Sequence, residues 1–188
     1  MSAPLGSKLE RSMNIPTITV RKLEAAQRQV NTAIKLWFAD ADSVSVHTLA
    51  CAAHQIIHDI NTDVDGSDLL FDSAVIKDEF RTEFVREMKK AMNFFKHADK
   101  DPDPNGIIEL SPQITELFIL FSVIGIERLG SPHSFDTTAF VLYYGIKNPR
   151  LVTKLFSDRI KIEDVAGLQS VSKAEFLKHF QSAKRQSK

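Results

Sequence analysis

Cysteine is nearly absent from this chain, which contains only Cys51 among its 188 residues. A single cysteine excludes an internal disulfide and a zinc site built on cysteines, a pattern that fits a reducing compartment. The N-terminal residues lack the basic segment and apolar run of a signal peptide. The longest apolar run, Leu117 to Ile126, is too short to cross a bilayer. We therefore expect a cytoplasmic protein that does not enter a membrane.

Net charge is also absent, because 24 Lys and Arg residues balance 24 Asp and Glu residues. The protein as a whole is therefore not an electrostatic nucleic-acid binder. The seven glycines are scattered, so the chain has no glycine-rich phosphate loop, and no serine nucleophile elbow occurs. The charge is uneven, however: residues 40–79 are acidic, whereas residues 81–96 and the tail 184–188 lean basic. These segments are either solvated faces or, where basic, a local patch for a phosphate backbone.

What the sequence does contain is helical periodicity. Hydrophobic residues (43%) and charged residues (26%) occur in ordinary globular proportions, and no strand pattern or repeat is present. We expect helices at about 19–41, 43–61, 73–97, 112–129, 135–146 and 172–183, with short helical pieces at 149–156 and 162–168. Residues 1–16 lack periodicity and are expected to form a flexible arm. The sequence thus predicts an all-α multi-helix bundle, one domain over residues 17–188 with a basic C-terminal tail.

Local signals predict the ends and faces of these helices. Ser43 or Ser45 is expected to cap the second helix, and Ser111 is expected to cap the fourth, before a proline at its first helical position. Ser172 and Glu175 form a capping box. The alanines at 50, 52 and 53 allow close approach of a neighbouring helix, and the nearly all-apolar helix 112–129 should be central. The core stripe of helix 73–97 is predicted to be Phe80, Phe84, Met88, Ala91 and Phe95.

The first candidate site lies on the helix at 73–97. A rotation of about 100° per residue places four polar residues on one face, namely Arg86, Lys90, Asn93 and His97. A histidine beside an amide and cations can act as a general acid or base on a phosphodiester while the cations stabilise the developing charge. The candidate catalytic residues are therefore His97 and Asn93, and the candidate phosphate-binding residues are Lys90, Lys96 and Arg86. The alternative is a solvated face whose basic residues favour the helix dipole.

The second candidate site lies on the helix at 43–61. His54 and His58 are one turn apart, the spacing that lets two imidazoles share a metal. His58 and Asp59 form the adjacent pair used by metal-dependent phosphohydrolases of the HD type. His47 lies about 10 Å from His54 along the helix axis, too far to join them. The alternative is that these histidines edge a helix interface, with Cys51 as a small core residue.

The loop at 101–108 resembles the first eight positions of an EF-hand calcium loop. Asp101, Asp103 and Asn105 would be oxygen ligands, and Gly106 would provide the sharp turn before the apolar anchor Ile108. The position of the bidentate glutamate is held by Pro112, which cannot ligate a metal. An ordinary turn explains this segment better, and we expect neither a metal nor a cofactor.

Two features together resemble the HEPN superfamily of helical bundles: the opening pair of helices at 23–38 and 47–60, and the segment from Asn93 to His97. HEPN ribonucleases carry an arginine, usually followed by a polar residue, three further positions and a histidine. Asn93 and His97 match the polar residue and the histidine, whereas Met92 stands at the arginine position. The resemblance covers roughly residues 20–130. The residues around the loop also resemble a family of bacterial proteins, which implies no mechanism.

The HEPN resemblance implies binding or cleavage of RNA or nucleotide phosphate without a metal, usually across a homodimer. His97 would be the general acid or base, and Asn93 would orient it or the phosphate. The missing arginine favours a second reading, a non-catalytic helical interaction module that partners another protein. A third reading is a metal-dependent phosphohydrolase that uses His54, His58 and Asp59.

Overall fold

The computed structural model describes residues 16–64, 66, 69–72, 76–99, 102–149 and 168–186. Within them the chain forms six α-helices, one short 3-10 helix and no strand, which confirms the all-α multi-helix bundle. The elements are α1 (Lys22–Phe38), α2 (Ser43–Asp63), η1 (Leu70–Asp72), α3 (Asp78–Lys96), α4 (Pro112–Arg128), α5 (Phe135–Lys147) and α8 (Lys173–Gln186). The predicted arm and the helical pieces at 149–156 and 162–168 lie, apart from their end residues 16, 149 and 168, outside the described residues.

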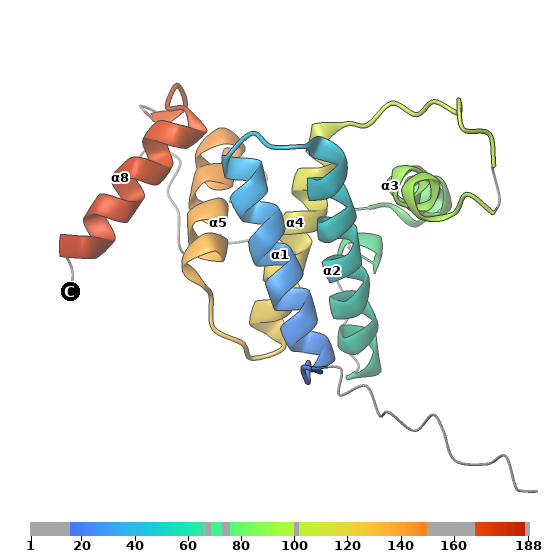
Figure 1. Cartoon of the computed structure of the whole chain (residues 1–188), viewed down its shortest axis with the longest axis horizontal. Coiled ribbons are helices and arrows are strands. Elements are labelled where there is room, and N and C mark those ends of the chain that lie inside the picture. The colour runs from blue at the N-terminus through green and yellow to red at the C-terminus, as the bar shows by residue number, and fades with distance from the viewer. Residues whose placement is uncertain are drawn as a thin grey trace, which may run out of the picture.

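Four helices form the body of the fold. α1, α2, α4 and α5 run side by side, whereas α3 lies beyond α2 and α8 lies beyond α5 on the opposite side (Figure 1). α3 is seen nearly end-on in this view, so its axis crosses those of α1 and α2. Because α3 packs mainly on α2 and η1, most of its surface is free to carry polar side chains.

The contact between α2 and α4 is unusually close, as the alanines of α2 predict. Ala50 and Ala53 are fully buried, and Gly125 of α4 faces the same helix. A Cβ atom at Gly125 would overlap Cγ2 of Ile57 and lie 3.1 Å from a methyl group of Leu69. Since Ile57 is β-branched and stiff at χ1, it has little freedom to move away. There is therefore no room for a side chain at position 125, and only glycine fits.

α4 is the central helix, as its all-round apolar sequence predicts. Ten of its residues are buried, in an unbroken run from Phe118 to Ile126 together with Thr115. The proline at its first helical position also matches the prediction. The hydroxyl of Ser111 binds the side chain of Gln113 at 2.8 Å and does not cap the backbone, which differs from the prediction.

The predicted cap of α2 is wrong. Asp42 is the cap, because its carboxylate accepts a hydrogen bond from the backbone N–H of Ser45 at 2.8 Å. These hydrogen bonds to Ser45 also lower the pKa of Asp42. The capping box of α8 is confirmed: Ser172 Oγ accepts from the N–H of Glu175 at 3.3 Å, and Glu175 accepts from the N–H of Ser172 at 3.1 Å.

The predicted core stripe of α3 is only partly correct. Met88 and Ala91 are buried and Phe84 packs against the core, but Phe80 is 56% exposed. α3 meets the core through residues 84–92, and its first turn lies outside this contact, so helical spacing alone misplaces Phe80. Met92, which was not on the predicted stripe, is buried.

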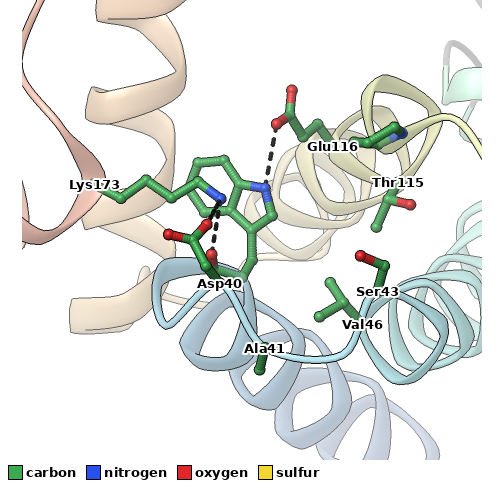
Figure 2. A pocket seen from close by; sticks show the side chains of 9 residues that line it. Asp40, Ala41, Ser43, Val46, Thr115, Glu116 and Lys173 are labelled. Carbon is green, nitrogen blue, oxygen red and sulfur yellow. Dashed lines mark hydrogen bonds and ion pairs between the residues drawn. The ribbon is translucent and has the colours of Figure 1, made fainter.

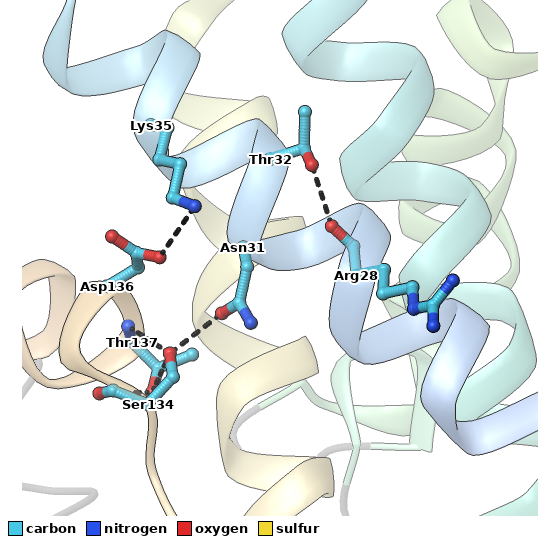
Figure 3. A network of polar contacts seen from close by, with 7 residues as sticks. All are labelled: Arg28, Asn31, Thr32, Lys35, Ser134, Asp136 and Thr137. Atoms are coloured by element: carbon cyan, nitrogen blue, oxygen red, sulfur yellow. Dashed lines mark hydrogen bonds and ion pairs between the residues drawn. The ribbon is translucent and has the colours of Figure 1, made fainter.

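The start of α5 is joined to α1 by a polar network (Figure 3). Ser134 Oγ accepts a hydrogen bond from the N–H of Thr137 at 3.1 Å and so caps α5. The same hydroxyl donates to Asn31 Oδ1 at 2.8 Å, and Lys35 lies 3.4 Å from Asp136. The Ser134 hydroxyl therefore satisfies a backbone N–H that has no partner within the helix, and it also holds α5 against α1.

We expect Gly125→Ala to lower the free energy of unfolding by about 1–3 kcal/mol, because the added methyl overpacks the α2–α4 contact. In an exposed helix, replacing glycine by alanine raises stability by about 1 kcal/mol. A decrease in stability would therefore indicate overpacking. Urea unfolding measures the difference. Ile57→Ala removes the opposing methyl, so the double variant should be less destabilised than the sum of the two single variants. A Gly125→Ala variant as stable as the parent chain would contradict this packing.

Candidate functional site

The structure exposes most of the predicted polar face of α3. Arg86, Lys90 and Asn93 are exposed, as is Lys96 at the end of the helix. His97 is the residue that follows the helix, and its backbone N–H binds the carbonyl of Asn93 at 3.0 Å. Its imidazole is 40% exposed, with Nδ1 3.6 Å from a carboxylate oxygen of Asp99. These side chains can therefore be reached by a ligand from solvent.

The cations on this face differ in their partners. Arg86 lies 3.2 Å from Glu83 and 3.4 Å from Glu87, and Lys90 lies 3.9 Å from Glu87. Exposed pairs of this kind are worth little and exchange readily for other anions. Lys96 has no carboxylate partner within the described residues. The segment from residue 89 to residue 97 carries three lysines and no acidic side chain, so its electrostatic potential favours anions.

An exposed aromatic ring lies on the same helix as these cations. Phe94 is 37% exposed, whereas its neighbour Phe95 is half-buried and contacts His47 edge-on at 5.9 Å. The loop at Gly106 approaches one edge of the Phe94 ring, where a Cβ would lie 3.4 Å away. Sequence reasoning did not assign Phe94 a role. Its exposure could have been predicted, because two adjacent phenylalanines on a helix cannot both lie on the buried face.

The residue at the HEPN arginine position points into the protein. Met92 is only 9% exposed and belongs to the hydrophobic core. A guanidinium at this place would have to leave water, which is costly without a paired carboxylate. No cation therefore projects from this position beside Asn93, and the charge on this face comes from lysines and Arg86.

The histidines of α2 lie inside the fold. His47 is fully buried, with Nδ1 2.9 Å from Thr115 Oγ1 and Nε2 3.3 Å from Cys51 Sγ. Burial lowers the pKa of His47 to about 4 and raises the pKa of Cys51 to about 12, although Lys96 opposes the second shift. Both groups are consequently neutral near pH 7, and a thiolate–imidazolium pair does not form. Cys51 is a core residue, as the sequence predicts.

His54 is surrounded by rings. It is fully buried and makes edge contacts with Phe71 at 4.9 Å and Phe118 at 5.2 Å. Burial, and then the charges of His58 and Lys89, lower its pKa to about 3. Within the part of the chain that the structure describes, neither ring nitrogen of His54 has a hydrogen-bond partner.

The predicted metal pair of α2 gains no third ligand within the described residues. The rings of His54 and His58 are 5.9 Å apart, and His58 Nδ1 lies 3.6 Å from a carboxylate oxygen of Asp59. In that part of the chain no three residues of His, Cys, Asp or Glu come together as a metal site would require. The observed surroundings are those of a helix interface.

The loop after α3 forms a turn. Asp103 accepts a hydrogen bond from the N–H of Asn105 at 2.9 Å, and its carbonyl accepts from Gly106 at 3.1 Å. This Asx-type geometry is an ordinary turn, as the sequence favours. The other acidic position, Asp101, lies outside the described residues.

Comparison with known proteins gives no relative. No protein-family model matches the sequence, and no curated protein or solved structure matches the chain. Among the helices described, none has both the length and the apolar character that a membrane span requires. The chemistry of the side chains is therefore the guide to function.

We expect the burial of His54 to make stability depend on pH. Its pKa is about 3 in the folded protein and about 6.5 in the unfolded chain, so acidification below pH 6.5 favours the unfolded state. Because of this one imidazole, the free energy of unfolding should fall by about 2 kcal/mol between pH 7 and pH 5. Urea unfolding of the His54→Leu variant over the same pH range should lack this decrease. At pH 7 its free energy of unfolding should be no lower than that of the parent chain.

The control is His179→Leu, which changes an exposed histidine on α8 and should keep the full pH dependence. Equal pH dependence in His54→Leu and the parent chain would contradict the burial of a neutral imidazole. A large loss of stability at pH 7 would show instead that the His54 nitrogens have a partner in solution.

Proposed function

We propose that this chain binds single-stranded RNA, or the phosphate of a nucleotide, through the C-terminal half of α3, without a metal and without cleaving it. The observation that carries the proposal is the C-terminal end of α3, where residues 89–97 hold three lysines and no acidic residue and where Lys90, Asn93, Phe94 and Lys96 are exposed. The resemblance of Asn93 and His97 to the HEPN motif supports the same ligand class.

Phosphate contacts are the first part of the proposed RNA interface. Lys96 has no carboxylate partner within the described residues, and Lys90 has only a distant one, Glu87 at 3.9 Å. Arg86 can exchange its exposed carboxylate partners for a phosphate at little cost. Asn93 adds an amide that donates hydrogen bonds, and His97 adds a second donor at the helix end. The polyanionic backbone of RNA can therefore lie along this face.

Base stacking on Phe94 is the second part of the proposed RNA interface. Proteins that bind single strands combine a cationic surface with aromatic rings on which bases stack, and the stacking tolerates any base. Phe94 is the exposed ring that follows Asn93, one helical turn after Lys90, and the half-buried Phe95 contacts it edge-on with ring centres 5.8 Å apart. This arrangement favours single strands over a duplex, whose bases are already stacked.

We expect no cleavage because of two features at the C-terminal end of α3. Met92 is buried where HEPN ribonucleases present an arginine, so no guanidinium projects beside Asn93, and Arg86 lies about two helical turns earlier. Lysine does not replace it, because an ammonium lacks the planar pair of donors that binds two phosphate oxygens. His97 also faces Asp99, with which it shares a contact of 3.6 Å.

A second candidate function is an interaction module that pairs with another protein or with a second copy of the chain. It is favoured by two large apolar side chains outside the core, Phe80 at 56% exposure and Ile107 at 92%. Neither side chain has a role in RNA binding, so this function and the first do not compete for residues.

Titration of a labelled oligouridylate, followed by fluorescence anisotropy, tests the proposal. Phe94→Leu should weaken binding about tenfold because one stacked base is lost. Lys96→Ala should reduce the slope of log affinity against log salt by about 0.7, the share of one phosphate contact. EDTA should change neither value, and gel analysis should find the RNA intact.

Matched controls come from the same molecule. Phe80→Leu changes an exposed ring at the other end of α3, and Lys178→Ala removes an exposed lysine from α8 on the far side of the fold (Figure 1). Both should bind like the parent chain. The proposal is contradicted if the folded parent chain binds no RNA, a result that leaves the interaction module as the favoured function. RNA cleavage lost in His97→Ala would establish catalysis, and cleavage lost in EDTA would favour the metal-dependent alternative.

A further inference from the structure

A cavity with polar and apolar walls lies where α1, α2, α4 and α8 meet, apart from the cationic end of α3. Its volume is about 280 Å³. The residues around it come from the end of α1, the turn between α1 and α2, the starts of α2 and α4, and the first residue of α8 (Figure 2). They are Trp37, Asp40, Ala41, Ser43, Val46, Pro112, Thr115, Glu116 and Lys173.

One alkylammonium group is already bound at the edge of this cavity. Lys173 Nζ lies 4.1 Å from the centre of the Trp37 ring and donates hydrogen bonds to Asp40 at 2.7 Å and to the Trp37 carbonyl at 2.9 Å (Figure 2). An aromatic face combined with carboxylate and carbonyl oxygens is the environment that proteins use to recognise ammonium ions. Asp40 reaches this position from a left-handed backbone conformation, with φ of 48°, which aspartate tolerates better than most residues.

Glu116 supplies a second carboxylate that Lys173 does not directly bind. One oxygen accepts a hydrogen bond from the indole N–H of Trp37 at 3.2 Å, and no hydrogen bond to the other is present within the described residues. Burial raises the pKa of Glu116, although the Trp37 hydrogen bond and the charge of Lys173 oppose the shift. When both carboxylates are ionised, Asp40 and Glu116 outweigh the single ammonium. A second cation would therefore be stabilised in the cavity.

We propose that this cavity binds a small organic cation, a primary ammonium on a short alkyl chain, with Glu116 as its counter-ion. The ammonium pairs with the free oxygen of Glu116, and the alkyl chain lies against Val46 and Pro112. Thr115 contributes its hydroxyl, which His47 holds at 2.9 Å from within the core. Anions are excluded by the two carboxylates, and the volume limits the ligand to a few carbon atoms.

The chain carries its own reporter for this site. Trp37 is the only tryptophan, and its indole forms part of the cavity wall, so its fluorescence responds to a ligand here. Titration of the full chain with 1,4-diaminobutane should give a saturable change, whereas butane-1,4-diol, which has the same length without charge, should give none. Glu116→Gln should weaken the response about tenfold or more, because a charge-assisted hydrogen bond is lost. Lys173→Met should strengthen it at least about threefold, because a neighbouring positive charge is removed.

Glu109→Gln is the matched control, since it removes an exposed carboxylate outside the cavity and should leave the titration unchanged. Circular dichroism confirms that each variant is folded, and Lys173→Met tests the site even if Glu116→Gln fails to fold. The proposal is overturned if neither the parent chain nor Lys173→Met gives a saturable response. It is also overturned if the diol acts like the diamine or if folded Glu116→Gln binds as tightly as the parent chain. These outcomes are independent of RNA binding.

Discussion

The close approach of α2 to α4 is the constraint on which the rest of the structure depends. Gly125 leaves no room for a Cβ beside Ile57, and Ala50 and Ala53 are fully buried. Because the two helices lie this near, His47 of α2 can hydrogen-bond Thr115 in the first turns of α4. The next residue along α4 is Glu116, which thereby comes within 3.2 Å of the indole of Trp37 on α1. One packing requirement thus places both the buried histidine and the carboxylate of the cavity.

The same packing separates neutral polar groups inside the fold from charged groups outside it. His47, Cys51 and His54 are buried among apolar and aromatic side chains and are uncharged near pH 7. They stabilise an interface and have no charge with which to act on a phosphate. α3, in contrast, crosses the bundle and contacts it through one stripe, so its last turns present lysines and Phe94 to solvent (Figure 1). The chemistry proposed for this protein therefore lies on its periphery.

Helical periodicity predicted the fold well, because burial of one stripe per helix is a local property of the sequence. The central place of α4, the capping box at Ser172 and the core position of Cys51 were all predictable. Phe80 was wrongly predicted to be buried. Periodicity indicates which face of a helix is apolar, but it does not indicate where the neighbouring helix ends along that face. The sequence identified Met92 as the residue at the HEPN arginine position, but it did not predict that the Met92 side chain is buried. The meeting of Glu116 with Trp37 and Lys173 depends on tertiary contacts across 79 and 136 residues, which no local pattern encodes.

The most direct test of the central claim is hydrogen–deuterium exchange of the full chain with and without saturating oligouridylate. We expect RNA to slow backbone exchange in the peptides that span Lys90 to His97 and to leave exchange in the peptides of α8 unchanged. Exchange reports each segment separately, so it distinguishes a ligand on α3 from general stabilisation of the fold. Protection confined to α8, or no protection on α3 when RNA is bound, would contradict the account.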